Sequence, residues 1–266
     1  MEIKINQKTV FVGVGLESIN NDTTAILLLH GAACDHTVWS PLSRFLSSKN
    51  HSIITPDFPG HGISGGDPIK TIELLAEWTF ELINSMKIEK LSIIGHSMGA
   101  LVALELAPTL GKKLKSLSII AGAAKVRVNE ALINAAINDT PSAIKMMNLW
   151  SFSSSSHLEG AQIPGIRQNI LALRLMERAN PGVLANDLKA SARYTNGMDA
   201  AKSITAPTKV VIGSHDIMIP PKESHKLAKI LPDCEVNEIP GCGHMIMSEA
   251  PKYLQRLFTP LIISNK

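Results

Sequence analysis

Short apolar runs rich in valine and isoleucine alternate with helical patterns along most of the chain. Gly, Pro or Asp bounds each run, as is usual for buried strands, and the segments between the runs have the spacing of amphipathic helices. Strands and helices that alternate in this way predict an α/β fold with a doubly wound, mainly parallel sheet. The expected strands are TVFVGV, AILLLH, SIITPD, KLSIIG, KSLSII, TKVVIG and CEVNEIP, and the expected helices are Trp39–Ser48, Thr71–Met86, Met98–Leu110, Pro221–Leu231 and Met247–Ile263.

The alternation stops between Lys125 and Met198, where the sequence reads as consecutive helices. We predict that residues 125–198 form a helical lid inserted into a core made of residues 1–124 and 199–266. The segments SFSSSSHLEG and ANPGV inside the lid have turn and loop compositions. Because ligands of doubly wound sheets bind at the carboxyl ends of the strands, the lid is expected to cover that edge.

The composition is that of an ordinary globular protein. Of 266 residues, 45% are apolar and 18% charged, which excludes a disordered or fibrous chain, and the net charge of +3 is too small to indicate a nucleic-acid groove. No apolar run approaches the ~18 residues of a membrane span. The first residues lack the pattern of a signal peptide, and three cysteines, an odd number, fit a reducing compartment. We expect a cytoplasmic protein, either a monomer or a homodimer.

One junction between a predicted strand and a predicted helix has the sequence Gly95-His96-Ser97-Met98-Gly99. This G-x-S-x-G pattern in a strand–turn–helix context predicts a nucleophile elbow. So tight a turn crowds the backbone on both sides of the serine, and glycine relieves the crowding. The elbow lifts the hydroxyl of Ser97 off the sheet, and the amide of Met98 at the start of the helix can face a developing oxyanion.

A serine hydroxyl needs a base to become a nucleophile, and the base needs a third group to orient it. His244 lies in a glycine-rich loop between a predicted strand and the last helix, from which an imidazole can reach across the carboxyl edge of the sheet. Asp216 directly follows the strand TKVVIG. We therefore predict Ser97 as nucleophile, His244 as base and Asp216 as the orienting acid.

Four motifs together resemble the α/β-hydrolase superfamily, in which the triad has this chain order of Ser, Asp and His. They are LLLHGAACDHTVW, DFPGHGIS, GHSMGA and the late pair GSHD with GCGHM. The resemblance implies that His30 and Gly31 introduce the loop that supplies the second oxyanion donor, which we place on the amide of Ala32. It also implies a structural turn over 57–62. A serine at the elbow departs from the haloalkane dehalogenases and epoxide hydrolases, which attack with a carboxylate there, and argues against both activities.

Several neighbouring residues are weaker candidates for these roles. His215 adjoins Asp216, but adjacent side chains of an extended segment point to opposite sides. Asp57 belongs to the structural turn, and Asp233 precedes a strand and so lies at the wrong end of it. Cys234, Cys242 and His244 lack a recognised metal-ligand spacing, so we predict no metal site.

These features predict a serine hydrolase that cleaves carboxyl esters of small, mostly apolar molecules without a cofactor. Met147 and Trp150 of the lid are candidates for an acyl pocket or for the core of the lid. Two other functions are compatible with the sequence. One is a carbon–carbon bond hydrolase of ring-fission products, which would share the triad and lid, and the other is a hydrolase-fold ligand sensor whose lid recruits a protein partner.

Overall fold

The computed structural model describes the chain except for residues 6, 15–22, 48–50, 159–166 and 264–266. At its centre lies an eight-stranded sheet with the order β1-β2-β4-β3-β5-β6-β7-β8. The strands are β1 (Glu2–Ile5), β2 (Lys8–Val14), β3 (Ala25–Leu29), β4 (Ile53–Pro56), β5 (Leu91–His96), β6 (Leu114–Ile120), β7 (Thr208–Gly213) and β8 (Cys234–Ile239).

The strands from β3 to β8 pair in parallel, and β1 and β2 add an antiparallel edge. Strands β3, β4 and β5 are buried along their whole length, because helices cover both faces of a parallel sheet. The predicted fold class, a doubly wound and mainly parallel sheet, is confirmed.

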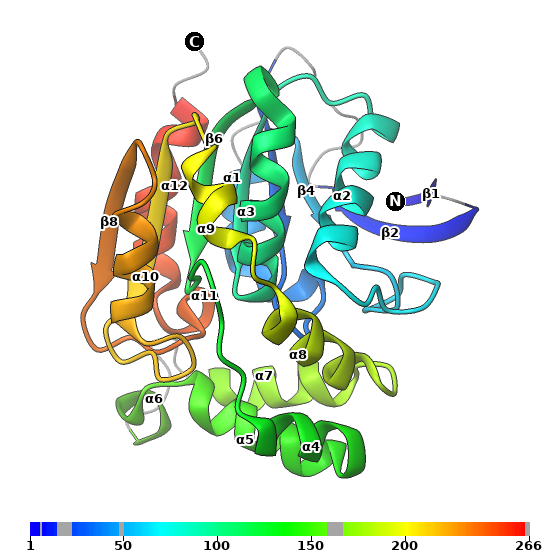
Figure 1. Ribbon diagram of the computed structural model, residues 1–266, viewed down its shortest axis with the longest axis vertical. Coiled ribbons are helices and arrows are strands. Elements are labelled where there is room, and N and C mark those ends of the chain that lie inside the picture. The colour runs from blue at the N-terminus through cyan, green and yellow to red at the C-terminus, as the bar shows by residue number, and fades with distance from the viewer. Residues whose placement is uncertain (6, 15–22, 48–50, 159–166, 264–266) are drawn as a thin grey trace.

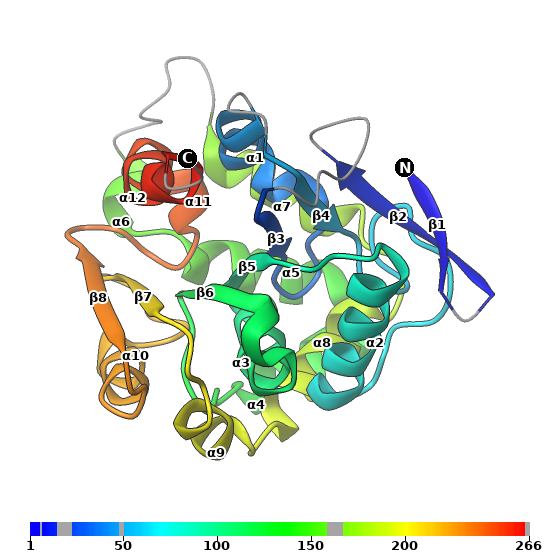
Figure 2. The ribbon, with the colours of Figure 1, turned by 90° about the horizontal axis from the view of Figure 1, so that it is seen from above.

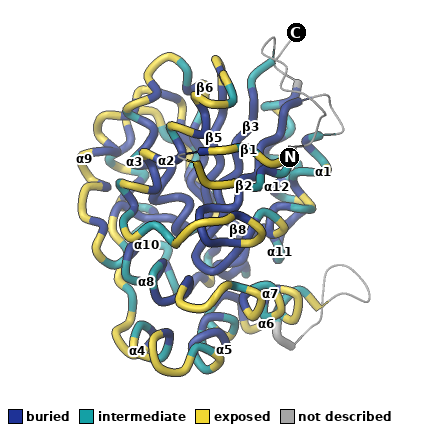
Figure 3. Tube along the Cα trace, turned by 90° about the vertical axis from the view of Figure 1, so that its right-hand side faces the viewer, coloured by how far each residue is buried: buried dark blue, intermediate teal, exposed yellow. Residues whose placement is uncertain are grey.

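Helices cover the two faces of the sheet, as the view from above shows (Figure 2). On one face, α1 packs against α12, and on the other, α2 packs against α3. Buried segments concentrate at the sheet and exposed ones on outer helices such as α4 and α9 (Figure 3). The helices flanking the sheet are α1 (Ser40–Ser47), α2 (Ile72–Ser85), α3 (Met98–Leu110), α10 (Pro221–Ala228), α11 (Ile246–Glu249) and α12 (Pro251–Ile263), with short 3-10 turns at His36–Trp39 and Gly111–Lys113.

The segment between β6 and β7 is helical, and its helices α4 to α8 lie together beyond one end of the sheet (Figure 1). Apolar side chains of α4, α5, α7 and α8 form a cluster of their own, which Ala33 of the core joins. The last helix of the segment, α9, packs instead on α3. The division into a core and a lid at residues 125 and 198 stays a prediction. These helices are α4 (Glu130–Asn138), α5 (Thr140–Ser151), α6 (Ser154–Leu158), α7 (Gln168–Glu177), α8 (Val183–Arg193) and α9 (Gly197–Lys202).

Two helical details differ from the sequence-based expectation. The serine run expected to be a loop contains the short helix α6, whose neighbour Ser153 donates to the buried carboxylate of Glu249 at 2.7 Å. The last helix, expected to run unbroken from Met247, is divided at Ala250 into α11 and α12. Pro251 follows the break, and the residue before a proline disfavours the helical conformation.

Among the described helices, none is both long and apolar enough to span a membrane.

Helix α12 should contribute strongly to stability through Phe258, which is fully buried in the apolar cluster that also holds Leu46 of α1. We expect Phe258→Ala to lower the free energy of unfolding by about 3–5 kcal/mol, because it removes a large buried ring and leaves a cavity. Urea denaturation measures the change. Arg256→Ala on the exposed side of the same helix is the control, with an expected change within about 0.5 kcal/mol. Equal effects of the two substitutions would contradict the docking of α12.

Candidate active site

The strand β5 passes into helix α3 through a strained turn at Ser97. The backbone angles of Ser97 are φ 54° and ψ −117°, in a region that side-chain-bearing residues rarely adopt. A Cβ on Gly95 would lie 2.3 Å from the carbonyl oxygen of Gly99, and a Cβ on Gly99 would lie 2.3 Å from that of Leu29. Glycine is therefore required on both sides of the serine, because backbone approaches backbone too closely for any side chain.

Asp216 and His244 meet at the carboxyl ends of β7 and β8. His244 Nδ1 lies 2.8 Å from Asp216 Oδ2, and both side chains are buried. The other carboxylate oxygen, Oδ1, accepts the amides of Met218 and Ile219, each at 2.9 Å. These two bonds fix the plane of the carboxylate, so Oδ2 faces the imidazole. Because a carboxylate accepts, His244 donates from Nδ1 and leaves Nε2 as its second nitrogen.

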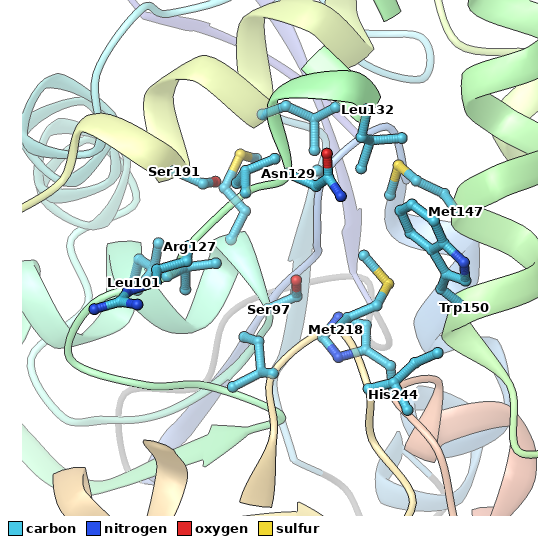
Figure 4. A pocket seen from close by; sticks show the side chains of 17 residues that line it. Ser97, Leu101, Arg127, Asn129, Leu132, Met147, Trp150, Ser191, Met218 and His244 are labelled. Atoms are coloured by element: carbon cyan, nitrogen blue, oxygen red, sulfur yellow. The ribbon is translucent and has the colours of Figure 1, made fainter. Parts of the chain in front are cut away.

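Ser97 and His244 line the same cavity, which has a volume of about 260 Å³. Figure 4 shows the serine hydroxyl directed into this space, with Asn129 and Met147 on the far side. The walls are mainly apolar and come from both the sheet edge and the helical segment between β6 and β7. The cavity therefore has the composition of a pocket for a small, largely apolar molecule. Its apolar lining includes Leu101, Leu132, Met147, Trp150, Leu188 and Met218.

Both predicted oxyanion donors, Ala32 and Met98, line this cavity as well. Met98 is the first residue of α3, and the first amides of a helix have no acceptor within the helix. Ala32 lies in the loop that follows β3. The structure thus brings four of the five predicted site residues to one cavity, and the fifth, Asp216, lies behind His244 and is hydrogen-bonded to it.

His96, between Gly95 and Ser97, is completely enclosed. Its Nε2 donates to the carbonyl oxygen of His244 at 3.1 Å, and Nδ1 has no hydrogen-bond partner among the described residues. Burial, together with the neighbouring His244, holds the pKa of His96 well below its usual value. His96 therefore stays neutral and supports the loop of His244.

The rival acids and the rival base lie elsewhere. His215 is exposed while Asp216 is buried, and Asp233 is exposed before β8. Asp57 is buried in its turn, where it accepts from His36 Nδ1 at 2.8 Å and from the amide of Ile63 at 3.1 Å. Burial alone would raise the pKa of Asp57, but the bonds from His36 outweigh it, and the pKa is lowered.

Asp35, His36 and Asp57 form a group whose possible metal-ligand atoms lie within 4.8 Å of one another. Other groups of the same chain already form hydrogen bonds with these atoms. Asp35 accepts from the amide of Thr37 at 2.8 Å and from Arg178 at 3.0 Å, and Asp57 is bonded to His36. The group has the character of an ion-pair network. The cysteines Cys34, Cys234 and Cys242 are free, and burial raises the pKa of the Cys34 thiol to about 12.

Residues 126–129 form one wall of the cavity and are not among the residues predicted from the sequence. This segment follows the carboxyl end of β6. Its position directly after a parallel strand could have predicted that it lines the ligand site, because ligands of such sheets bind at the carboxyl ends of the strands. Asn129 also caps α4 by accepting the amide of Ala131 at 2.8 Å, which fixes its side chain above the cavity (Figure 4).

Comparisons with known proteins agree with this architecture. A solved esterase from Thermogutta terrifontis superposes with a TM-score of 0.84 at 21% identity, covering 97% of this chain and 94% of that one. An enol-lactonase from Burkholderia xenovorans gives 0.84 at 19% identity, over 98% and 99% of the two chains. Structural similarity at such low sequence identity shows that these proteins share the fold.

Two curated proteins also align over most of their length. A Mycoplasma pneumoniae protein named as an esterase/lipase is 26% identical over 85% of this chain and 84% of its own. The 3-oxoadipate enol-lactonase 1 of Acinetobacter baylyi is 23% identical over 90% and 89%. The family model described as "Alpha/beta hydrolase family" matches residues 26–255. The resemblance seen in the sequence motifs is thereby confirmed, and the chain belongs to the α/β-hydrolase family.

Proposed function

We propose that this α/β hydrolase is a serine hydrolase that cleaves carboxyl esters of small, mostly apolar molecules. One observation carries the proposal: a serine on a strained elbow and an imidazole bonded to a buried carboxylate at 2.8 Å line the same cavity. Serine, histidine and aspartate in these roles are the parts that acyl transfer needs.

In the proposed reaction, the hydroxyl of Ser97 attacks the ester carbonyl while His244 Nε2 takes its proton. The amides of Ala32 and Met98 stabilise the tetrahedral oxyanion. His244 then returns the proton to the departing alcohol, and an acyl-enzyme remains. Water, activated by the same imidazole, attacks the acyl group and releases the acid. The bond to Asp216 orients the imidazole and stabilises its positive charge during both steps.

The size and lining of the cavity favour acyl groups of limited length. The volume of about 260 Å³ suits a small molecule, and side chains of helices α4, α5 and α8 line the space together with Ser97. We propose that residues 125–198 act as a lid that excludes water from the acyl-enzyme. Relatives named esterase/lipase and enol-lactonase support the same reaction class, since a lactone is a cyclic ester.

A substrate panel tests the proposal against its alternatives. It consists of p-nitrophenyl esters of graded acyl length, an enol-lactone and a ring-fission dienoate. Ester or lactone turnover with many cycles per enzyme is expected. Turnover of the dienoate alone would favour carbon–carbon bond hydrolysis. A single turnover, accompanied by a change in lid conformation, would favour a ligand sensor.

Ser97→Ala should abolish ester turnover and labelling by a fluorophosphonate, because it removes the only proposed nucleophile. Its stability should stay close to that of the wild type, since the hydroxyl faces a cavity. Steady-state kinetics and mass spectrometry of the labelled protein measure the two effects. Ser191→Ala, another serine lining the cavity, is the matched control and should keep the label. A label that persists in Ser97→Ala would refute the assignment.

Asp216→Asn should lower kcat by roughly 10⁴-fold, as in the best-studied serine triad. The amides of Met218 and Ile219 hold one side-chain oxygen, so the new NH₂ group must face His244 Nδ1. The imidazole then carries its proton on Nε2 and cannot accept one from Ser97. Steady-state kinetics measures kcat, and circular dichroism checks that the variant is folded. Asp233→Asn is the control at an exposed position and should keep its activity. If Asp233→Asn lost activity while Asp216→Asn kept it, the assignment of Asp216 as the orienting acid would be wrong.

Trp150→Ala should shift the preferred acyl chain of p-nitrophenyl esters toward longer chains. The indole lines the cavity on α5, and its removal makes room for additional methylenes, each contributing up to about 0.8 kcal/mol of binding. The measurement is kcat/KM across the ester series. Leu149→Ala, the exposed neighbour on the same helix, should leave the profile unchanged. An unshifted profile for Trp150→Ala would mean that the indole belongs to the packing of the lid.

A further inference from the structure

A buried carboxylate on helix α8, Asp187, joins the helical segment to the loop after β3. Its Oδ2 accepts the backbone amide of Ala33 at 2.9 Å and lies 2.8 Å from His61 Nε2. The side chains of Asp187 and His61 are only 1% and 2% exposed. Neither residue lines the cavity that holds Ser97, and the reaction proposed above uses neither.

The hydrogen-bond partners of His61 determine the protonation state of its ring. Its Nδ1 lies 3.1 Å from the carbonyl oxygen of Pro59 and its Nε2 faces the carboxylate of Asp187, and both of these groups only accept hydrogen bonds. Both nitrogens therefore donate, which makes the ring an imidazolium. Burial lowers the pKa of His61, but the charge and hydrogen bond of Asp187 outweigh it, so the pKa is raised. Asp187 and His61 thus form a buried ion pair.

The oxyanion loop, residues 31–33, is held at two points. His30 Nδ1 donates to the carbonyl oxygen of Gly31 at 2.9 Å, and Asp187 accepts the amide of Ala33. Ala33 has a φ of 51°, a left-handed conformation that is strained for alanine and persists only where surroundings enforce it. Between these two anchors lies Ala32, whose amide is the proposed oxyanion donor.

From this geometry we infer that Asp187, with His61 as its counter-ion, is a positioning residue that aims the amide of Ala32 at the oxyanion. Asp187 acts through Ala33: its bond keeps the strained backbone of Ala33 in place and so sets the orientation of the preceding peptide. His61 holds the carboxylate of Asp187 so that its Oδ2 faces the loop. This inference rests on the proposed ester hydrolysis, since the oxyanion arises in that reaction.

The same carboxylate links catalysis to the position of α8. Leu188, the next residue on α8, and Ser191, one turn further on, line the substrate cavity. A helix shifted away from the core would therefore widen the cavity and release the oxyanion loop together. Oxyanion donors act only when placed at hydrogen-bond distance from the developing charge, so a small displacement of Ala32 is enough to lose the effect.

Three variants separate positioning from mere stability. His61→Leu with Asp187→Leu removes the acceptor of the Ala33 amide, yet replacing a buried ion pair by apolar side chains is often neutral for stability. Asp187→Asn is the conservative variant, because an amide oxygen can still accept from Ala33. Asn186→Ala is the matched control: Asn186 donates to the carbonyl oxygen of Ile69 at 2.8 Å and at 3.4 Å to Oδ1 of Asp187, the carboxylate oxygen that does not accept from Ala33.

The readouts are kcat and KM for a p-nitrophenyl ester and the inhibition constant of a trifluoromethyl ketone, which forms an oxyanion on the enzyme. For the double leucine variant, we expect kcat to fall about 10- to 100-fold, less than the ~10²- to 10³-fold effect of deleting a donor outright. KM should stay nearly constant, and the ketone should bind more weakly by the same factor as kcat/KM falls. Asp187→Asn and Asn186→Ala should both stay close to the wild type.

Amide hydrogen exchange at Ala33 supplies a readout independent of turnover. Protection should be present in the wild type and in Asp187→Asn and lost in the double leucine variant. If the double leucine variant does not fold, His61→Ala with Asp187→Ala replaces it, leaves no unpaired buried charge and should show the same losses. A folded variant that lacks the acceptor but keeps its kcat and ketone affinity would overturn the inference, and so would an Asp187→Asn enzyme as impaired as the double variant. A wild type that protects Ala33 but turns over no ester would refute the proposed function and leave the anchor standing.

Discussion

The close approach of three backbone segments around Ser97 is the constraint on which the rest of the site depends. Strand β5, helix α3 and the end of β3 meet so tightly that a Cβ on Gly99 would lie 2.3 Å from the carbonyl oxygen of Leu29 and 2.5 Å from that of His30. Because α3 lies against the end of β3, the loop after β3 starts beside the serine. The amides of Met98 and Ala32 therefore reach the same cavity from two different segments.

The strand–helix alternation was enough to predict the doubly wound sheet, because both periodicities are local properties of the sequence. Ser97, Asp216 and His244 could be selected for a related reason. Each follows a strand, and the carboxyl ends of parallel strands share one edge, so topology brings together residues that are far apart in the chain. The glycine at position 95 could be interpreted because its crowding comes from Gly99 within the same turn, whereas Gly99 itself is crowded by the end of β3, which is distant in the sequence.

What the sequence could not predict depends on packing between distant segments. Asp187 and His61 are 126 residues apart, and nothing near either residue indicates that they meet. A histidine in a glycine-rich turn and an aspartate in an amphipathic helix are ordinary in those settings, and only the docking of α8 on the core pairs them. Helix α6 was missed for a similar reason, since the buried carboxylate of Glu249 binds the serines at its start.

The hydrogen-bond partners of the buried histidines also limit which imidazole can serve as the base. His30 uses both nitrogens, one toward the carbonyl of Gly31 and one toward the amide of Phe58, and its pKa falls to about 4 through burial and the neighbouring His61. His61 donates from both nitrogens, so it has no lone pair for a proton. Burial holds the pKa of His96 well below its usual value, so this imidazole cannot serve as the base. His244 differs from all three, because Asp216 occupies Nδ1 alone and the side chain lines the cavity beside Ser97, which leaves Nε2 to accept the proton there.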